Sequence, residues 1–309
     1  METLPTHDPS KSPAALDLRG LRAFLAVAEE LHFGRAAERL GMAQPPLSQL
    51  IRRLEQGLGH SLFLRDTRKV ELTAAGQALV ELARDLFSRL DNGLKHVHAV
   101  GRGEAGRLVI GFTPTVALNI LPRVILRFRD DYPDVEVGLF EMLPDPLHEA
   151  LDSRVIDAAI IREPSEDLGK RIIPIFLEPF VAVLPATHPL ADPDTPFDLG
   201  MLRSEPFVLF PHDRGSRNLA KPLALCAEAS FVPRVVQEVP GWQTAVSMVG
   251  AGIGVSIQPA SVTQLQSPGV VYRRIPSKIQ SVVALMTRPQ DERPMIANFI
   301  SASAQLMGG

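Results

Sequence analysis

The chain has 309 residues, more than one small domain needs, and 45% of them are hydrophobic, so we expect two or three packed domains. No apolar run approaches the length of a transmembrane helix, and the N-terminus lacks the apolar segment of a signal peptide. A net charge of −3 argues against a general polyanion binder, and the single cysteine, Cys226, excludes an intramolecular disulfide. These features predict a cytoplasmic protein without a membrane segment.

The first stretch, residues 1–16, contains three prolines and several serines and threonines without periodicity, which predicts a disordered tail. Residues 17–76 then show helical patterns. An amphipathic helix comes first, and its apolar positions are Leu18, Leu21, Phe24, Leu25 and Ala28.

Two short helices follow, at Gly34–Gly41 and Gln44–Glu55, joined by a turn of a few residues. The second begins with prolines, which a first helical turn tolerates because its N–H groups have no intrahelical partner. This pattern predicts a helix-turn-helix whose second helix can enter a DNA major groove. Residues Phe63–Leu72 predict a hairpin wing with basic residues near its tip, where it can follow a minor groove.

The second helix has an apolar face for packing and a polar face for DNA. Glutamine and serine can bond base edges, and arginine can bond guanine or phosphate. The candidate DNA-contacting residues are Gln44, Pro45, Pro46, Ser48, Gln49, Arg52 and Arg53, with Arg65 and Arg68 in the wing. The alternative is an amphipathic helix with a solvated charged face. Residues 17–76 carry nine Lys or Arg against seven Asp or Glu, so binding would need more than one copy.

Thr73 can cap a long helix that spans residues 73–100 and carries a heptad repeat of apolar residues. A helix of this length has no neighbour within a small winged domain, so the stripe predicts a seam between subunits. Its members are Leu79, Ala83, Leu86, Leu90 and Val97. The alternative is a helix that lies on the chain's own next domain. Residues 101–106 contain three glycines and predict a flexible hinge.

Residues 107–309 alternate between strand and helix patterns, which predicts βαβ units, a parallel sheet and two α/β lobes with a cleft between them. The predicted strands cover 108–112, 135–141, 158–162, 180–184, 207–210, 234–239, 254–258, 270–275 and 282–287. The predicted helices cover 118–129, 146–153, 218–229, 243–249 and 295–306.

Ligands of such sheets bind outside the carboxyl ends of the strands. The candidate ligand-binding residues at those ends are Thr113, Pro114, Thr115, Leu143, Pro144, Arg162, Phe210, Pro211 and Trp242. The threonines precede a predicted helix and can hold a carboxylate, for which Arg162 would supply the counter-charge. The alternatives are helix capping for the threonines, an ion pair with Glu163 or another acid for Arg162, and core packing for Trp242.

Residues 24–76 resemble the LysR-type transcriptional regulator family. The matching positions are Phe24, Phe33, Ala36, Ala37, Leu40, Gln44, Pro45, Ser48, Ile51, Leu54, Glu55, Leu58, Gly59, Leu62, Phe63, Arg65, Arg68, Leu72, Thr73, Ala75 and Gly76. The resemblance implies a winged helix-turn-helix, a long linker helix and a two-lobed effector domain like the periplasmic binding proteins.

The resemblance also implies a ligand-responsive regulator that binds promoter DNA as a homodimer or homotetramer, and that contacts RNA polymerase. In the branch that regulates aromatic degradation, the positions of Arg162 and Phe210 hold the effector, which is an aromatic or muconate-like acid. That branch often has a hydroxyl residue where this chain has Leu143 and Pro144.

No G-x-S-x-G, H-E-x-x-H or C-x-x-C motif occurs, so we expect no catalysis, metal or cofactor. The competing interpretation is a ligand-binding or enzymatic α/β protein whose N-terminal helices serve only to dimerise it. The polar face of Gln44–Arg53 and the basic wing favour the regulator.

Overall fold

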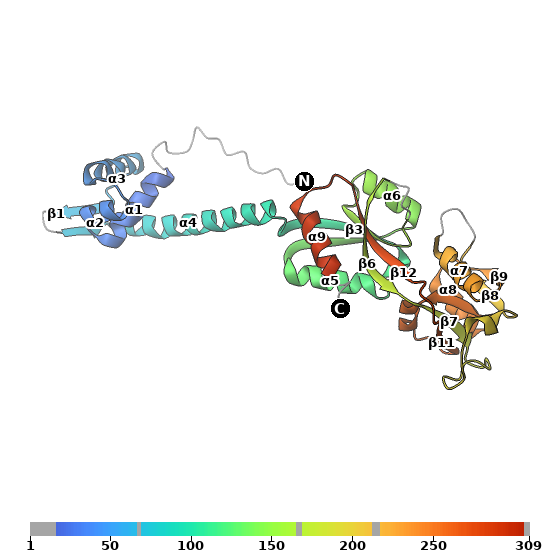
Figure 1. Cartoon of the computed structure of the whole chain (residues 1–309). Helices are drawn as coiled ribbons and strands as arrows, with labels where there is room; N and C mark the ends of the chain where they lie inside the picture. The colour runs from blue at the N-terminus through green and yellow to red at the C-terminus, as the bar shows by residue number, and fades with distance from the viewer. Residues whose placement is uncertain (1–16, 67–68, 165–168, 212–216, 306–309) are drawn as a thin grey trace. The chain divides into compact units, whose positions relative to one another are not determined.

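A computed structural model describes residues 17–66, 69–164, 169–211 and 217–305 (Figure 1). Two compact units divide the chain at Val97 and His98, and each is described by itself. The predicted tail and Arg68 lie outside the described residues. Among the helices of the described ranges, none is long and apolar enough to cross a membrane.

The first unit contains the predicted helix-turn-helix and wing. Its elements are α1 (Leu18–Glu30), α2 (Phe33–Arg39), α3 (Gln44–Leu58), the antiparallel hairpin of β1 (Phe63–Asp66) and β2 (Lys69–Leu72), and most of α4 (Ala74–Gly101). The three helices pack on a core that includes Phe24, Leu47, Ile51 and Leu54, each at most 1% exposed. Burial of one helix stripe against the others fixes which face of α3 remains free.

Polar bonds attach the wing to the helices around it. The Glu55 carboxylate on α3 accepts from the backbone N–H of Leu62 at 2.9 Å. The Thr73 hydroxyl accepts from the Gly76 N–H at 2.9 Å and donates to the Ser61 carbonyl at 2.8 Å. Thr73 therefore caps α4, as the sequence predicts. Gly76 is required there, because a Cβ would overlap the Leu62 carbonyl.

The apolar stripe of α4 divides between two environments. Leu79 and Ala83 are 6% and 0% exposed and belong to the core of the first unit, so the prediction that they form a seam between subunits is corrected. α1 and the wing cover the first turns of α4, which the heptad pattern alone does not reveal. Farther along, Leu86 and Leu90 are half-buried and Val97 is 64% exposed.

A hydrogen-bonded turn at residues 102–104 lies within the stretch predicted as a hinge. The Glu104 N–H donates to the Ala99 carbonyl at 2.9 Å, and Gly103 has a φ of 69°, which ends α4 in a left-handed cap. The Asn298 amide donates to the carbonyls of Arg102 and Gly103 at 2.9 and 3.1 Å. These bonds join the end of α4 to α9 (Pro294–Ala304), and the next strand already begins at Ala105.

The first lobe of the second unit has a five-stranded sheet in the order β4-β3-β5-β12-β6. Its strands are β3 (Ala105–Phe112), β4 (Asp134–Glu141), β5 (Ala158–Arg162), β6 (Arg171–Glu178) and β12 (Ser281–Thr287). β3 is parallel to β4 and β5, but β12 is antiparallel to β5 and β6, so the prediction of a purely parallel sheet is wrong. β12 reaches the sheet from the other lobe, which reverses its direction.

Helices cover both faces of this sheet. α5 (Ile120–Asp131) and α9 pack together on one face, where the rings of Phe128 and Phe299 lie edge to face at 5.1 Å (Figure 1). α6 (Pro144–Asp152) packs on the other face through Leu147 and Leu151. Every residue of β5 is buried, which explains its unbroken apolar sequence.

Sequence patterns did not predict β6. Pro174 interrupts its alternation, and an edge strand tolerates proline where a bulge removes a pairing position. The pairing of β6 with β12 shifts register beside Pro174, between Val283 and Ala284. The omission matters because β6 ends with Glu178, a buried acid that lies 2.6 Å from Arg162.

The second lobe contains β7 (Phe180–Pro185), β8 (Pro206–Leu209), β9 (Arg234–Glu238), β10 (Ser256–Pro259), β11 (Val270–Arg274), α7 (Ala220–Glu228) and α8 (Trp242–Gly250). β10 and β11 flank β7 in antiparallel pairs, β8 and β9 are parallel, and a bridge from Phe207 to Val255 connects the two groups. The chain passes between the lobes at Glu178–Phe180 and again between Arg274 and Ser281. Burial raises the pKa of the Cys226 thiol on α7 to about 12.

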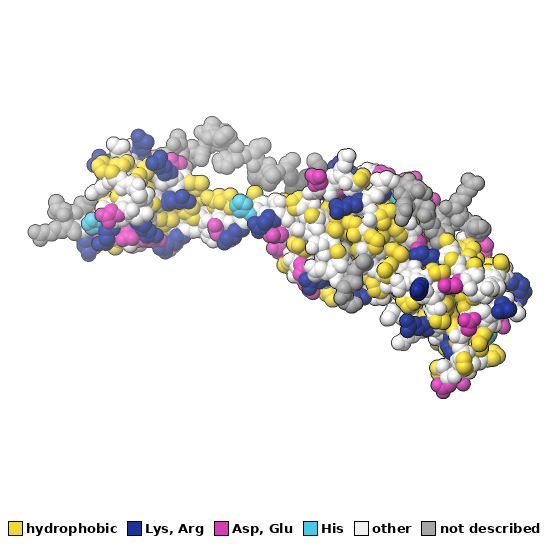
Figure 2. Space-filling model, in the orientation of Figure 1, with side chains coloured by type: hydrophobic (Ala, Val, Ile, Leu, Met, Phe, Trp, Pro, Cys, Tyr) yellow, Lys and Arg dark blue, Asp and Glu magenta, His cyan; other side chains and the backbone are white. Residues whose placement is uncertain are grey.

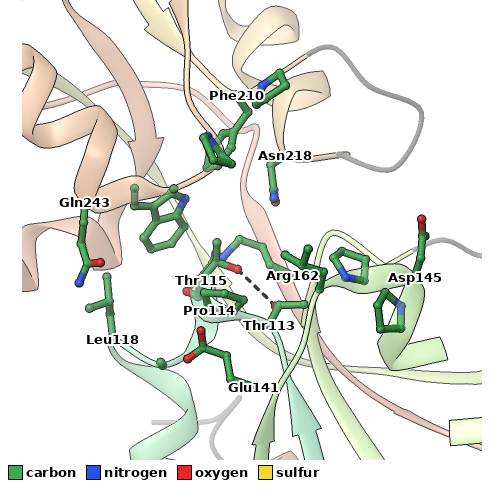
Figure 3. Close-up of a pocket in the computed structure, with 18 residues that line it drawn as sticks. Thr113, Pro114, Thr115, Leu118, Glu141, Asp145, Arg162, Phe210, Asn218 and Gln243 are labelled. Atoms are coloured by element: carbon green, nitrogen blue, oxygen red, sulfur yellow. Dashed lines mark hydrogen bonds between the residues drawn. The ribbon is translucent and has the colours of Figure 1, made fainter. Parts of the chain in front are cut away.

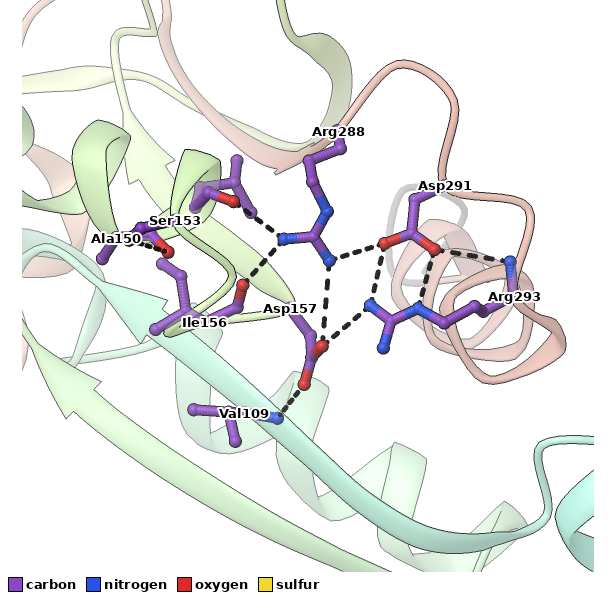
Figure 4. Close-up of polar contacts among 9 residues, drawn as sticks. Val109, Ala150, Ser153, Ile156, Asp157, Arg288, Asp291 and Arg293 are labelled. Atoms are coloured by element: carbon purple, nitrogen blue, oxygen red, sulfur yellow. Dashed lines mark hydrogen bonds and ion pairs between the residues drawn. The ribbon is translucent and has the colours of Figure 1, made fainter.

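Ion pairs and hydrogen bonds of four charged residues hold the loop between β12 and α9 (Figure 4). Arg288 donates to the carbonyls of Leu151 and Ile156 at 2.8 and 2.9 Å and pairs with Asp291 at 2.6 Å. Arg293 pairs with Asp291 and Asp157, each at 2.8 Å. Hydrogen bonds from Arg293 and Arg288 hold the pKa of Asp291 well below its usual range. The loop is therefore bound to the segment that joins α6 to β5.

Candidate functional site

The free face of α3 carries the predicted DNA-contacting residues. Leu47, Ile51 and Leu54 face the core, and Leu50 is partly buried. On the remaining surface, Ser48 is half-buried, and the following are exposed: Gln44, Pro45, Pro46, Gln49, Arg52 and Arg53. Figure 2 shows Lys and Arg side chains gathered over α3. The helix thus presents amides, a hydroxyl and two guanidinium groups along one side.

The arginines of the first unit differ in whether an acid neutralises them. Arg39 pairs with Glu29 at 2.8 Å, and Arg35 pairs with Glu30 at 3.3 Å. Arg52 and Arg53 make no ion pair with any residue in the described ranges. Arg65 lies in β1, although the structure does not describe its side chain. The two α3 arginines are therefore available to phosphate.

A cleft of about 450 Å³ lies between the two lobes of the second unit (Figure 3). All nine predicted ligand-binding residues line it, namely Thr113, Pro114, Thr115, Leu143, Pro144, Arg162, Phe210, Pro211 and Trp242. Further lining residues that the sequence did not indicate include Leu118, Glu141, Asp145, Asn218 and Gln243. Glu141 could have been predicted because it ends a predicted strand, whereas Asn218 begins a predicted helix and no sequence signal linked it to the cleft.

The two threonines lie after β3, but their local structure differs from the prediction. A single 3-10 turn, Pro114–Val116, follows Thr113, and α5 begins only at Ile120. The sequence predicted a helix from Leu118, two residues before the observed start. Thr113 is 5% exposed, and its hydroxyl lies 3.4 Å from that of Thr115. Both hydroxyls remain on the cleft wall without the N-terminus of α5 behind them.

Arg162 is not the free counter-charge that the sequence suggested. Its guanidinium is 5% exposed and lies 2.6 Å from the Glu178 carboxylate. It also donates to the Ser281 hydroxyl at 2.6 Å and to the Thr115 carbonyl at 3.3 Å. Burial lowers the pKa of Arg162, and Glu178 opposes that shift. The alternative weighed from the sequence, a pair with a nearby acid, describes Arg162 correctly, although that acid is Glu178 rather than Glu163.

This buried network connects the lobes. Glu178 accepts from the backbone N–H and the hydroxyl of Ser261, which lies in the second lobe. Beside it, Glu163 at the end of β5 pairs with Lys221 of α7 at 2.7 Å. Two cations and two carboxylates therefore balance across the passage between the lobes. Arg162, which belongs to this network and lines the cleft, therefore meets a ligand as a compensated charge.

Trp242 begins α8 at the cleft wall. It is 4% exposed, and its ring centre lies 4.8 Å from the guanidinium carbon of Arg162, in cation–π range. Among the described residues, no side-chain cap bond is made at the N-cap Gly241, and the first intrahelical bond runs from the Ala245 N–H. The N–H groups of the first turn of α8 are thus available where Gly241, Trp242 and Gln243 line the cleft. A helix N-terminus of this kind favours an anion.

These features define a class of protein in which a winged helix-turn-helix is joined to a two-lobed ligand-binding unit. Comparison with known proteins agrees. Residues 18–77 match the family model of bacterial regulatory helix-turn-helix proteins of the lysR family, and residues 101–308 match the LysR substrate binding domain.

Full-length relatives share the same organisation. The chain is 34% identical to the HTH-type transcriptional regulator AlsR of Bacillus subtilis, over 93% of this chain and 95% of that protein. It is 37% identical to XapR of Escherichia coli, over 94% and 98%. Among solved structures, the LysR family regulator CbnR matches with a TM-score of 0.83 and 28% identity, over 93% and 100%. CbnR in complex with its target DNA matches with a TM-score of 0.78.

The chain belongs to the LysR family of transcriptional regulators. It is a DNA-binding regulator with an effector-binding domain rather than an enzyme. Its helix-turn-helix unit binds DNA.

Proposed function

We propose that the effector is a small organic acid, and that an aromatic carboxylate fits the cleft better than a muconate-like dicarboxylate. The observation that carries this proposal is the N-terminus of α8, whose first residues line the same cleft as Thr113 and Thr115. N–H groups and hydroxyls together can bind a carboxylate without a free cation.

The walls of the cleft support an aromatic body. Leu118, Leu143, Phe210 and the Trp242 ring surround the space, whose volume of about 450 Å³ suits a small ligand. Glu141 and Asp145 are exposed and line the same cleft. These two acids would repel a second carboxylate, which sets the order of preference between a monocarboxylate and a muconate-like dianion.

Thermal unfolding of the full chain tests this proposal. A ligand that binds only the native state, at a concentration of about 100 Kd, adds about 2.7 kcal/mol of stability. We expect benzoate to raise the melting temperature more than cis,cis-muconate, and Thr115→Val to reduce the benzoate shift. Thr195→Val is the control, because Thr195 is half-buried and lies away from the cleft. If neither acid shifts the parent protein, the effector is not an acid of this kind.

We propose that α3 enters the major groove with Gln44, Ser48 and Gln49 toward bases and with Arg52 or Arg53 toward phosphate. Arg65 and Arg68 of the wing would follow a minor groove. The exposed amides and guanidinium groups of α3 support this orientation. Gln49→Ala should cost about 1–3 kcal/mol of discrimination at the base that it reads, and a gel shift with operator variants measures it.

We infer that α4 beyond the first core forms the seam of a homodimer, and that two dimers form a tetramer. Leu86, Leu90 and Val97 continue the stripe outside the core of the first unit. Replacing Leu86 and Leu90 by Asp would bury unpartnered charge in such a seam. Sedimentation should then show smaller particles, whereas Ser88→Asp on the opposite face should keep the parent mass. An unchanged mass in the double variant would contradict the seam.

We also propose that the regulator acts in the cytoplasm, where promoter DNA is accessible, and that its DNA-bound form contacts RNA polymerase. Effector-dependent recruitment of purified polymerase to a promoter fragment, measured by gel shift, tests that contact. If the regulator does not change how much polymerase binds the promoter fragment, the proposed contact with RNA polymerase is wrong.

A further inference from the structure

A second and much smaller cavity adjoins the ligand cleft. Its volume is about 10 Å³, and it shares Arg162, Phe210, Asn218 and Trp242 with the cleft. A cavity of this size holds one atom as large as a water oxygen. We call it the niche. Because the cleft and the niche share four residues, a substituent of a ligand in the cleft can reach into the niche.

Three polar atoms belonging to these shared residues are buried and lack a hydrogen-bond partner within the described ranges. They are Arg162 Nε, Trp242 Nε1 and Asn218 Oδ1. Buried polar atoms are normally paired, so three unpaired atoms on residues that line one cavity point to a ligand group that enters it. Arg162 and Trp242 are both more than nine-tenths buried, at 5% and 4% exposure.

The surrounding contacts hold these atoms in place. Both terminal nitrogens of Arg162 are engaged by Glu178, Ser281 and Thr115, which leaves Nε as its only unused donor. The Trp242 ring lies over the same guanidinium. Figure 3 shows Asn218 extending from the second lobe toward Arg162, beside Phe210. These three lining residues of the niche thus carry two N–H donors and one carbonyl acceptor that have no partner in the described ranges.

We propose that the niche receives a hydroxyl group of the effector, so that the effector is a hydroxylated organic acid. A hydroxyl accepts two hydrogen bonds and donates one, which matches two N–H donors and one carbonyl. A carboxylate is too large for the niche and has no proton for Asn218. A methyl group would leave all three polar atoms unpaired. This inference rests on the proposed function, because it assumes that an organic acid occupies the cleft.

The placement is consistent with the proposed carboxylate site. The free N–H groups at the start of α8 and the indole N–H both belong to the segment that begins at Trp242. One residue can therefore contribute to binding the carboxylate through its backbone and the hydroxyl through its side chain. Asn218 and Trp242 would therefore distinguish a hydroxylated acid from the same acid without the hydroxyl group.

Calorimetric titration of the full chain with benzoate and with ortho-, meta- and para-hydroxybenzoate tests the inference. We expect at least one isomer to bind about tenfold more tightly than benzoate. The factor is moderate because water can fill a niche of this size when benzoate is bound. Trp242→Phe removes the N–H and keeps a ring over Arg162, and Asn218→Leu removes the acceptor.

Each variant should bring the best isomer to within about threefold of benzoate. Gln264→Leu, on an exposed turn of the second lobe, is the control and should keep the parent preference. If the parent protein binds all four acids with dissociation constants within about threefold of one another, the niche does not bind a hydroxyl group. The proposal that the effector is an organic acid then still stands. A preference that survives both variants also overturns the inference. If no acid binds, the acid proposal fails and the hydroxyl inference fails with it.

Discussion

Arginines occupy two contrasting settings in this protein. On α3, Arg52 and Arg53 are exposed and make no ion pair with any described residue. At the end of β5, Arg162 is 5% exposed and lies 2.6 Å from Glu178. An exposed and unpaired guanidinium can take a phosphate at little desolvation cost. A buried guanidinium that is paired with a carboxylate holds the residues around it in place. It can offer a ligand only the N–H donor that its partners do not use.

The same contrast holds for the apolar stripe of α4. Leu79 is enclosed by its own unit, whereas Val97, on the same face, is 64% exposed. Apolar residues of one stripe therefore serve folding near the wing and are exposed farther along the helix. A side chain that its own chain has already buried or paired serves folding. A side chain left exposed or unpaired can bind another molecule.

The largest effect should come from breaking the buried pair. Arg162→Met leaves the Glu178 carboxylate buried without a cation, and removal of one partner of such a pair costs about 3–5 kcal/mol. Urea unfolding should show this loss, and Glu178→Gln added to Arg162→Met should recover part of it. Arg53→Met on α3 is the matched control, which should stay within about 0.5 kcal/mol of the parent. Equal unfolding midpoints for the parent and Arg162→Met would contradict the compensated setting.

An intermediate effect should appear in DNA binding. Arg53→Ala should weaken binding to all sequences and reduce the salt dependence, because each phosphate contact contributes about 0.9 to the logarithmic slope. Arg39→Ala tests the contrast within the same unit, since Arg39 is already paired with Glu29 at 2.8 Å. Fluorescence anisotropy over a salt series should show a changed slope for Arg53→Ala only. Equal slopes for the two variants would show that pairing does not decide which arginine meets DNA.

The smallest expected effect is on the pH dependence of stability, and it comes from the paired acid Asp291. The Arg293 and Arg288 hydrogen bonds lower the pKa of Asp291 in the folded protein, so its stabilisation is present above the pKa of about 3.9 in the unfolded chain. That stabilisation is lost as the pH falls through the lowered folded pKa. Asp291→Asn should therefore be less stable than the parent near pH 7. The gap in melting temperature should narrow below about pH 4, and a gap independent of pH would contradict this assignment.

Much of the architecture could be predicted because it rests on local signals. The helix-turn-helix, the wing and the Thr73 cap follow from prolines, glycines and apolar spacing that each act within a few residues. The strand ends around the cleft could also be predicted, since parallel strands place their carboxyl ends at one edge. The sheet was predicted less well where local signals conflict, as at Pro174 in β6.

By itself, the sequence determined the family, the order of elements and the nine predicted residues that line the cleft, because periodicity and turn residues act over short distances. Only the tertiary structure decided which of these groups remain free. It paired Arg162 with Glu178, a residue on a strand that local patterns missed. It enclosed Leu79 and Ala83 in the first unit and brought Asn218 to the niche beside Trp242. Charge compensation and burial depend on contacts between residues far apart in the chain, and no local pattern encodes them.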